Sequence, residues 1–159
     1  ADMAIAVSAP TAGRLSVQKL TDYKLHLVAA RKYIRSSAPI TSVEDLRHHR
    51  MIGYIPDMIF DKELDYLDEA GIEKVHLASN SVSVQFNWIR QGAGLGFVHD
   101  FTMPFDHRLV KVLPNEVSLT RSFYLIRHAD DRRLERMNRF AEELGEGIRR
   151  EVAKLEAGG

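Results

Sequence analysis

Residues 79–99 constrain the fold of this chain more than any other stretch. They begin as a turn rich in hydroxyl groups, continue as a helix, stop at a run of glycines and end in a short apolar strand. The apolar stripe of the helix consists of Val82, Phe86, Ile89 and Ala93. This spacing predicts a helix that begins near Ser81 and packs through one face.

The hydroxyl groups at the start of this helix suggest an anion site. Ser81 and Ser83 stand where the free backbone N–H groups of a first helical turn point outward. A helix start with hydroxyl groups and the positive end of a helix dipole can hold a carboxylate or phosphate without a cationic side chain. The alternative is that these serines only cap the helix, a role worth about 1 kcal/mol. As an anion site, the pattern would indicate recognition rather than bond breaking.

The composition is that of a globular chain without a strong charge. The 159 residues are 45% hydrophobic, which suits one domain or two small lobes. Lys and Arg total 22, as do Asp and Glu, so no net positive field attracts nucleic acid or an anionic membrane to this piece. The lack of cysteine excludes disulfides and thiolate sites and fits a reducing cytoplasm. No apolar run approaches the roughly 20 residues of a membrane span, and the first residues do not read as a signal peptide.

Strands are expected on both sides of a mixed central region. The N-terminal part predicts a strand at 2–7 and one or two strands at 15–30, separated by a Pro/Gly loop. Thr41 and Glu44 read as a capping box that opens a short helix to about His49. Strand and helix then alternate.

The central region reads as β-α-β-α-β, which predicts a parallel sheet covered by helices. Its expected elements are a strand at 51–55, a helix at 60–71, a strand at 75–78, the helix near Ser81 and a strand at 97–99. The first helix is predicted from its stripe of Phe60, Leu64 and Leu67. The glycines at 92–96 follow a helix and precede a strand, the reverse of a dinucleotide-binding loop, so they predict a helix end and a tight turn.

The C-terminal part predicts strands at 109–113 and 122–126, with a turn at 114–116, and then a long helix. The apolar stripe of that helix is Leu134, Met137, Ala141, Leu144, Ile148, Val152 and Leu155. Asp130 and Asp131 suit its N-terminal end, and 158–159 is a glycine stop.

This order of elements predicts two lobes. The chain is expected to leave a first lobe (1–30 and 118–159), build a second lobe (31–117) and return. Two crossing strands would then form a hinge, and the cleft between the lobes is the expected ligand site. Ligands of open α/β sheets meet the carboxyl ends of strands, which here lie at 54–56, 80–83 and 98–99.

Several stretches, taken in order, carry a family likeness over nearly the whole chain. They are the strand at 2–5, the strand at 20–30 with Tyr33, the helix start at 39–46, the helix and glycine turn at 80–96, and the strands at 109–113 and 121–126 before the long helix. In this order they resemble the effector-binding domain of LysR-type transcriptional regulators. The resemblance implies a two-lobed α/β fold of the type 2 periplasmic-binding-protein kind, with the first lobe incomplete in this chain.

The resemblance also implies a function. A small effector, expected to be a carboxylate, would bind in the cleft and control transcription through an N-terminal helix-turn-helix that nothing in this chain matches. The implied protein is a cytoplasmic homodimer or homotetramer, paired through the long helix and the helix at 60–67, with no catalytic residue, cofactor, metal or membrane contact. The ligand-binding positions carried over are Tyr54, Ile55, Pro56, Asn80, Ser81, Ser83, Val98 and His99. Asp100 departs from the family, which has a hydrophobic or Pro residue after that strand.

Two other classes of protein are weighed against this interpretation. An enzyme is disfavoured because the sequence has no G-x-S-x-G elbow and no H-E-x-x-H pair. His48 and His49 are expected to be solvated, and Trp88 to pack against a neighbouring element. His99 has two interpretations, a structural histidine or a residue that binds an acid or senses pH. A stand-alone solute-binding protein shares the two-lobe design and stays as the alternative.

Overall fold

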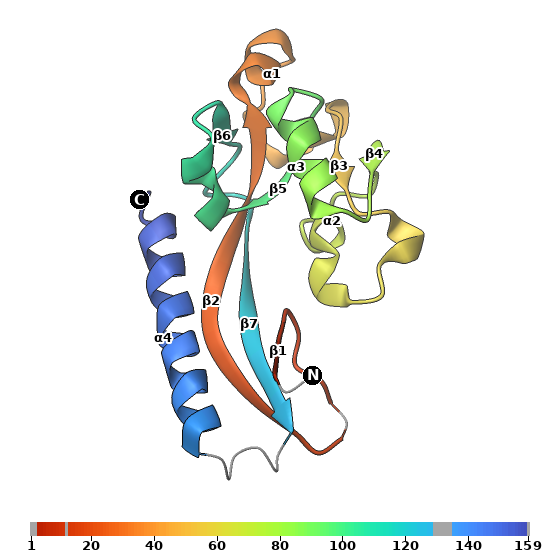
Figure 1. Cartoon of the computed structure of the whole chain (residues 1–159). Coiled ribbons are helices and arrows are strands. Elements are labelled where there is room, and N and C mark those ends of the chain that lie inside the picture. Colours follow the sequence, from red (N-terminus) through yellow and green to blue (C-terminus); the bar gives the residue numbers. More distant parts are fainter. Residues whose placement is uncertain (1–2, 12, 129–134, 159) are drawn as a thin grey trace.

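One strand, β2 (Leu15–Ala30), runs along much of the molecule and pairs with three others (Figure 1). The computed structural model describes residues 3–11, 13–128 and 135–158. In the larger sheet the order is β1-β7-β2-β5, and β6 also pairs with β2. The sequence left open whether 15–30 forms one strand or two, and the structure has one.

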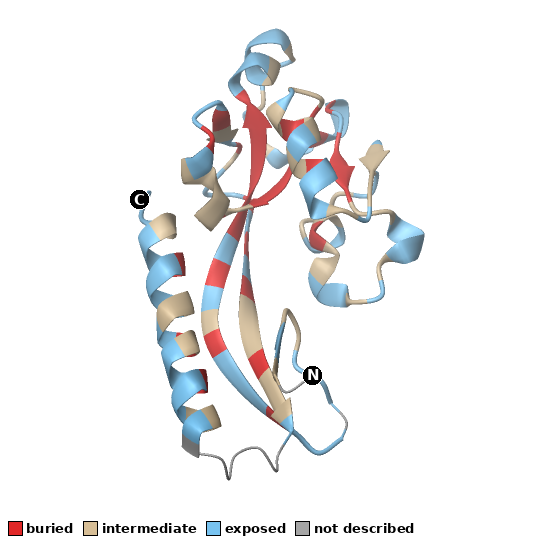
Figure 2. Cartoon of the chain, viewed as in Figure 1, coloured by how far each residue is buried: buried red, intermediate tan, exposed pale blue. Residues whose placement is uncertain are grey.

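The burial of β2 changes along its length (Figure 2). In the first part, buried side chains such as Leu20 and Tyr23 alternate with exposed ones, because one face is covered and the other is open. An irregularity between Lys19 and Thr21 shifts the register there, which moves the buried positions from even to odd numbers. Residues 25–30 are all buried, since both faces are covered in the upper part of the molecule.

β7 (Ser118–His128) accompanies β2 in antiparallel register, from Leu15 opposite His128 to His26 opposite Ser118. β1 (Met3–Ala6) forms the edge beyond β7. Both strands were expected, although β7 is longer than predicted. The two long strands connect the lower part of Figure 1 with the upper part.

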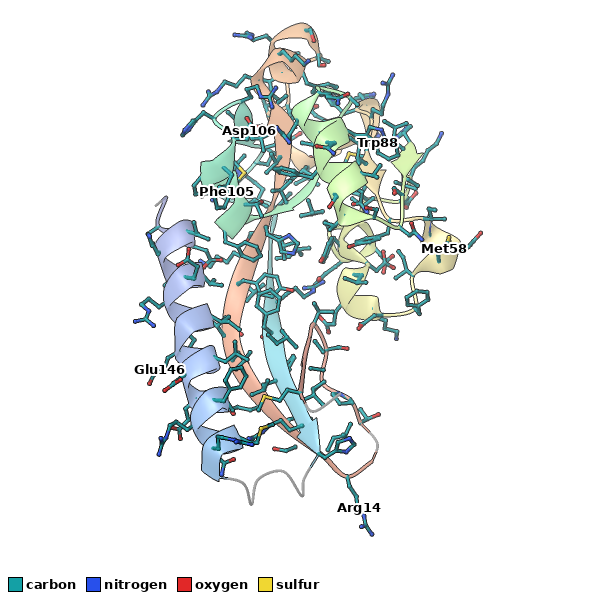
Figure 3. All side chains as sticks on the ribbon, viewed as in Figure 1. Arg14, Met58, Trp88, Phe105, Asp106 and Glu146 are labelled. Carbon is teal, nitrogen blue, oxygen red and sulfur yellow. The ribbon has the colours of Figure 1, made fainter. Side chains whose placement is uncertain are left out.

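The long helix α4 (Glu135–Glu156) lies alongside β2 (Figure 1). It is tied to β2 at two points: the Lys24 amide donates to the Glu156 carboxylate at 2.7 Å, and Arg149 donates to the Leu20 carbonyl at 3.1 Å. The predicted stripe is buried or half-buried at Met137, Ala141, Leu144, Ile148, Val152 and Leu155. Leu134, Asp130, Asp131 and Gly159 lie outside the described residues. Glu146 is exposed on the opposite side of the helix (Figure 3).

The upper part is built from short elements. In chain order they are α1 (Arg31–Ser36), the 3-10 helix η1 (Val43–His48), β3 (Ile52–Gly53), η2 (Pro56–Met58), η3 (Lys62–Leu64), α2 (Tyr66–Glu69), β4 (Leu77–Ala78), α3 (Val82–Arg90), β5 (Gly96–His99), η4 (Asp100–Phe105) and β6 (Leu109–Lys111). The expected parallel arrangement holds for β3 with β4 and for the bridge between Met51 and Leu95. β5, by contrast, runs antiparallel to β2.

The helix expected at 60–71 is wrong except for its last turn. Phe60 is 92% exposed, so the predicted apolar stripe does not form. Asp61 instead accepts from the Glu63 amide at 3.0 Å and starts the separate turn η3. Only α2 is helical beyond it, and the chain reverses at Gly71, whose φ of 77° suits glycine.

Two smaller expectations around η1 are also corrected. The capping box consists of Ser42 and Asp45, one residue later than predicted, because the Asp45 carboxylate accepts from the amides of both Thr41 and Ser42. His49 is buried rather than solvated, and its Nδ1 is hydrogen-bonded to the Tyr33 hydroxyl at 2.9 Å.

The glycine turn after α3 is confirmed. Gly92 has φ of 82° just past the helix end, the position where a left-handed residue closes a helix. A Cβ on Gly94 would come within 2.4 Å of the Arg50 carbonyl oxygen, so this close approach of two backbones needs glycine. Trp88 is half-buried and packs against the cluster around Val28 and Ile89, as predicted.

Candidate functional site

The start of α3 leaves two backbone donors free. Ser81 is the N-cap: its hydroxyl accepts from the Val84 amide at 3.4 Å, and its carbonyl accepts from the Gln85 amide at 3.1 Å. Within the described part of the chain, the amides of Val82 and Ser83 have no hydrogen-bond partner. The Ser83 hydroxyl also lacks one there. Ser81 therefore caps the helix and Ser83 does not.

A cavity of about 380 Å³ opens beside this helix start. It lies between α3 and η4, with β5 beneath it and β7 contributing one residue. We call it the aromatic cavity, and its lining residues are Val82, Ser83, Gln85, Phe86, Phe97, Val98, His99, Phe101, Thr102 and Phe123. Five of these side chains carry rings, and none is a Lys, Arg, Asp or Glu.

His99 contributes a neutral imidazole to the aromatic cavity. Burial lowers its pKa to about 4, although the neighbouring Asp100 carboxylate acts in the opposite direction. The imidazole stacks on Phe101 with ring centroids 4.9 Å apart, and Tyr23 lies behind it at 5.4 Å. A neutral imidazole presents one donor and one acceptor, so His99 can recognise an uncharged polar group at neutral pH.

A second, smaller cavity of about 180 Å³ adjoins the first, because Gln85 and Phe97 line both. We call it the acidic cavity, since Asp65, Asp68 and Glu73 are among its lining residues. Its wall also includes Tyr66, a buried residue whose phenol pKa is raised by that burial.

Five of the eight sequence-predicted ligand residues line one or the other of these two cavities. Ser83, Val98 and His99 line the aromatic cavity. Tyr54 and Pro56 line the acidic cavity. Ile55, Asn80 and Ser81 line neither: Ile55 precedes η2, Asn80 is exposed in the turn before α3, and Ser81 caps that helix.

Several lining residues escaped the sequence analysis. Phe101 and Thr102 belong to a segment with no motif, and Phe123 belongs to a predicted strand that is remote in sequence from the other lining residues. Gln85 did carry a signal, because a polar residue on the inner face of a helix needs a partner. It is 6% exposed, and its amide donates to the Ser79 carbonyl at 2.8 Å.

Asp100, whose place was in doubt, anchors the η4 wall of the aromatic cavity. Its carboxylate is buried and pairs with His26 Nδ1 at 2.6 Å and with Lys111 Nζ at 3.2 Å. Thr102 donates its hydroxyl to the His99 carbonyl at 2.7 Å, which tightens the same turn. These bonds fix the backbone that presents His99 and Phe101.

Arg121 connects β7 to the segment around α2 through ion pairs. Its guanidinium is buried, lies 3.0 Å from a Glu63 carboxylate oxygen and also pairs with Glu69. It stacks over the Tyr66 ring at 5.5 Å, so it also supports a wall of the acidic cavity. The sequence analysis gave no sign of this contact, because the three charged residues are dispersed along the chain.

Two further properties bear on the class of site. Over the described ranges, no three His, Asp or Glu side chains are grouped so as to hold a metal ion. No helix in that part of the chain is long and apolar enough to cross a membrane.

The comparison with protein-family models decides the family. A model described as the LysR substrate binding domain matches residues 1–149. The chain belongs to the LysR substrate-binding domain family. LysR substrate-binding domains are the effector-binding parts of transcriptional regulators and are not enzymes, and the two-lobed α/β fold inferred from the sequence is the fold of this family.

Solved structures agree with the LysR fold. The regulatory domain of CrgA from Neisseria meningitidis superposes with a TM-score of 0.76 at 21% identity, over 92% of this chain and 74% of that one. The regulatory domain of NMB2055 (MetR) from N. meningitidis gives 0.65 at 20%, over 92% and 69%. Full-length AphB from Vibrio cholerae gives 0.66 at 18%, over 99% of this chain and 52% of AphB. No curated protein sequence matches significantly.

Proposed function

We propose that this chain is the effector-sensing part of a LysR-type DNA-binding regulator of transcription, and that a small anionic metabolite binds at the start of α3. The observation that carries the proposal is the pair of amides of Val82 and Ser83, which have no hydrogen-bond partner among the described residues and lie at the edge of the aromatic cavity. Two N–H groups of a first helical turn and the Ser83 hydroxyl suit the acceptor oxygens of a carboxylate.

The charges around the two cavities favour the start of α3 as the place where the anion binds. A carboxylate in the acidic cavity would face Asp65, Asp68 and Glu73. The lining of the aromatic cavity has no acidic side chain, and the positive end of the α3 dipole opens onto it. The anionic group of the effector therefore belongs at Ser83, and the remaining bulk of the effector in the aromatic cavity.

The proposed mechanism uses the two lobes expected from the sequence, 1–30 with 118–159 and 31–117. The aromatic cavity joins Phe123 of β7 to α3 and η4, so a ligand there contacts both lobes. An effector that binds the closed arrangement more tightly shifts the population toward it, by as much as its affinities differ. In a cytoplasmic homodimer or homotetramer, this shift would change the arrangement of DNA-binding domains outside this chain.

The test compares two serines that the sequence did not distinguish. Ser83→Ala should weaken binding of benzoate while leaving the melting temperature unchanged, because its hydroxyl caps nothing. Ser81→Ala should lower the unfolding free energy by about 0.5–1 kcal/mol through loss of the cap and change benzoate binding little. Isothermal titration and thermal melting give both quantities. Benzoate affinity that is unchanged in Ser83→Ala, or that falls only with stability, would contradict the proposal.

A further inference from the structure

We propose that the effector is a planar aromatic acid whose ring lies in the aromatic cavity between α3 and η4. This inference rests on the proposed function and adds the chemical class of the molecule. It follows from what lines the cavity, how those side chains are held and how large the space is.

The lining selects for a ring. Four phenylalanines and one imidazole face the space, together with two valines and three small or medium polar side chains. Aromatic faces and edges attract other rings beyond simple burial of area. None of these residues supplies a formal charge at neutral pH, so the cavity favours an uncharged body and leaves any charge to its edge at Ser83.

The rings of the cavity wall pack against one another and against Tyr23. Phe101 lies against His99 on one side and against Phe123 at a centroid distance of 6.2 Å on the other. Tyr23, which is 1% exposed, backs all three and stacks on Phe123 at 4.2 Å. Side chains that are packed against Tyr23 lose little conformational freedom when a ligand binds. This preorganisation favours a rigid, flat ligand.

The size and polarity of the aromatic cavity narrow the chemical class of the effector further. About 380 Å³ lies at the lower end of the range for small-molecule sites, which suits one ring or two fused rings. Besides Ser83 at the edge, the polar side chains in the wall are Thr102, Gln85 and His99. Each forms neutral hydrogen bonds, so they fit a hydroxyl, carbonyl or amino substituent on the ring.

The experiment titrates the 159-residue chain with three compounds and follows amide shifts by two-dimensional NMR. Benzoate carries a planar ring and a carboxylate, cyclohexanecarboxylate keeps the carboxylate on a puckered ring, and benzamide keeps the planar ring without the charge. We expect benzoate to bind about three- to tenfold more tightly than cyclohexanecarboxylate. We also expect ring-current shifts at Val98 and the largest amide shifts at Val82 and Ser83.

The outcomes separate this inference from the proposed function. Equal affinity for benzoate and cyclohexanecarboxylate would overturn the aromatic class and leave the anion site standing. Equal affinity for benzoate and benzamide would contradict the anion site while the ring preference stands. If neither carboxylate shifts any signal from α3 or β5, both proposals are wrong.

Substitutions supply a second readout with a matched control. Phe123→Leu keeps an apolar side chain but removes a ring from the cavity wall, so benzoate affinity should fall about three- to tenfold and cyclohexanecarboxylate affinity should hold. Phe105→Leu makes the same exchange on η4 at a side chain that is 73% exposed and does not line the cavity (Figure 3). It should change neither affinity. A loss of affinity for both compounds in Phe123→Leu would indicate a general change in the cavity and contradict ring recognition.

Discussion

At the scale of single residues, burial sets the chemistry of His99. Its imidazole is enclosed by Tyr23 and Phe101, and the pKa is lowered to about 4 because the charged form loses its water. The unfolded chain binds a proton at this position near pH 6.5 and the folded chain does not. Between these two pH values, proton binding therefore stabilises the unfolded chain relative to the folded chain.

This gives a prediction for stability against pH. As pH falls from about 6.5 to about 4, the wild-type chain should lose about 3 kcal/mol of unfolding free energy relative to His99→Phe, in which this titration is absent. Urea unfolding at several pH values measures the difference. Parallel pH profiles for the two proteins would show that His99 is protonated as easily when folded as when unfolded.

Asp106 titrates in the other direction. Its buried carboxylate accepts from Arg108 and from Arg90 Nε at 2.7 Å (Figure 3), and these bonds hold its pKa well below the usual range. The stabilisation is complete above about pH 4, the unfolded value, and is lost as the pH falls toward the folded pKa.

Asp106→Asn should consequently destabilise the protein by roughly 1–2 kcal/mol at pH 7. The loss should shrink in acid, because below about pH 4 the unfolded wild-type chain binds a proton at this carboxyl while the folded chain keeps it ionised, which favours unfolding of the wild type. Denaturant titrations at pH 7 and pH 3 provide the measurement. A deficit of the same size at both values would mean that the charge of Asp106 contributes nothing.

The limit of sequence reasoning is also visible at this scale. Ser81 and Ser83 have the same side chain two positions apart, and which one caps depends on the backbone angles that place Ser81 before the first helical residue. Spacing alone did not resolve this. The cavity-lining positions of Val98 and His99 followed from the end of a strand and were predictable, whereas that of Phe123 required knowledge of strand pairing.

At the scale of elements, those with their own periodicity were predictable. α4 matches its sequence pattern, because its stripe of apolar residues specifies both the element and its buried face. α3 forms where it was expected, but Val82 of its predicted stripe is 47% exposed and Ala93 lies beyond its end. The segment 60–71 has the apolar spacing of a helix but forms the turn η3 and the short helix α2 instead. Its Glu63 and Glu69 side chains pair with Arg121, a long-range contact that no local pattern encodes.

Two glycines provide a test of close packing between elements. Gly94→Ala should destabilise the protein strongly, by about 2 kcal/mol or more, because the added Cβ would meet the Arg50 carbonyl oxygen and force β3 and the α3–β5 turn apart. Gly147→Ala is the matched control. It lies inside α4 with nothing within 4 Å of a new Cβ, so it should stabilise by roughly 0.5–1 kcal/mol. Thermal melting compares them, and an equal effect from both would refute the packing argument.

At the scale of the whole molecule, Arg121 joins the long strands to the short-element region. Arg121→Met should remove about 2 kcal/mol of stability and speed amide exchange in residues 62–69, because Glu63 and Glu69 lose their buried partner. Lys19→Met is the control, since the Lys19–Asp22 pair is more than half exposed and contributes little. Hydrogen exchange read by mass spectrometry gives the result. Unchanged protection of 62–69 in Arg121→Met would show that other contacts hold this segment.

The pairing of β2 with β7 has a consequence for how the chain folds. Leu15 lies opposite His128, so the central ladder of the sheet joins two segments separated by almost the entire upper part. Contacts this remote in sequence slow folding, because the intervening chain must be closed into a loop before the ladder forms. On a ribosome, β2 is made well before β7 and has no partner along most of its length until β7 emerges. The nascent chain must therefore stay soluble with its longest strand unpaired while the whole segment between β2 and β7 is synthesised.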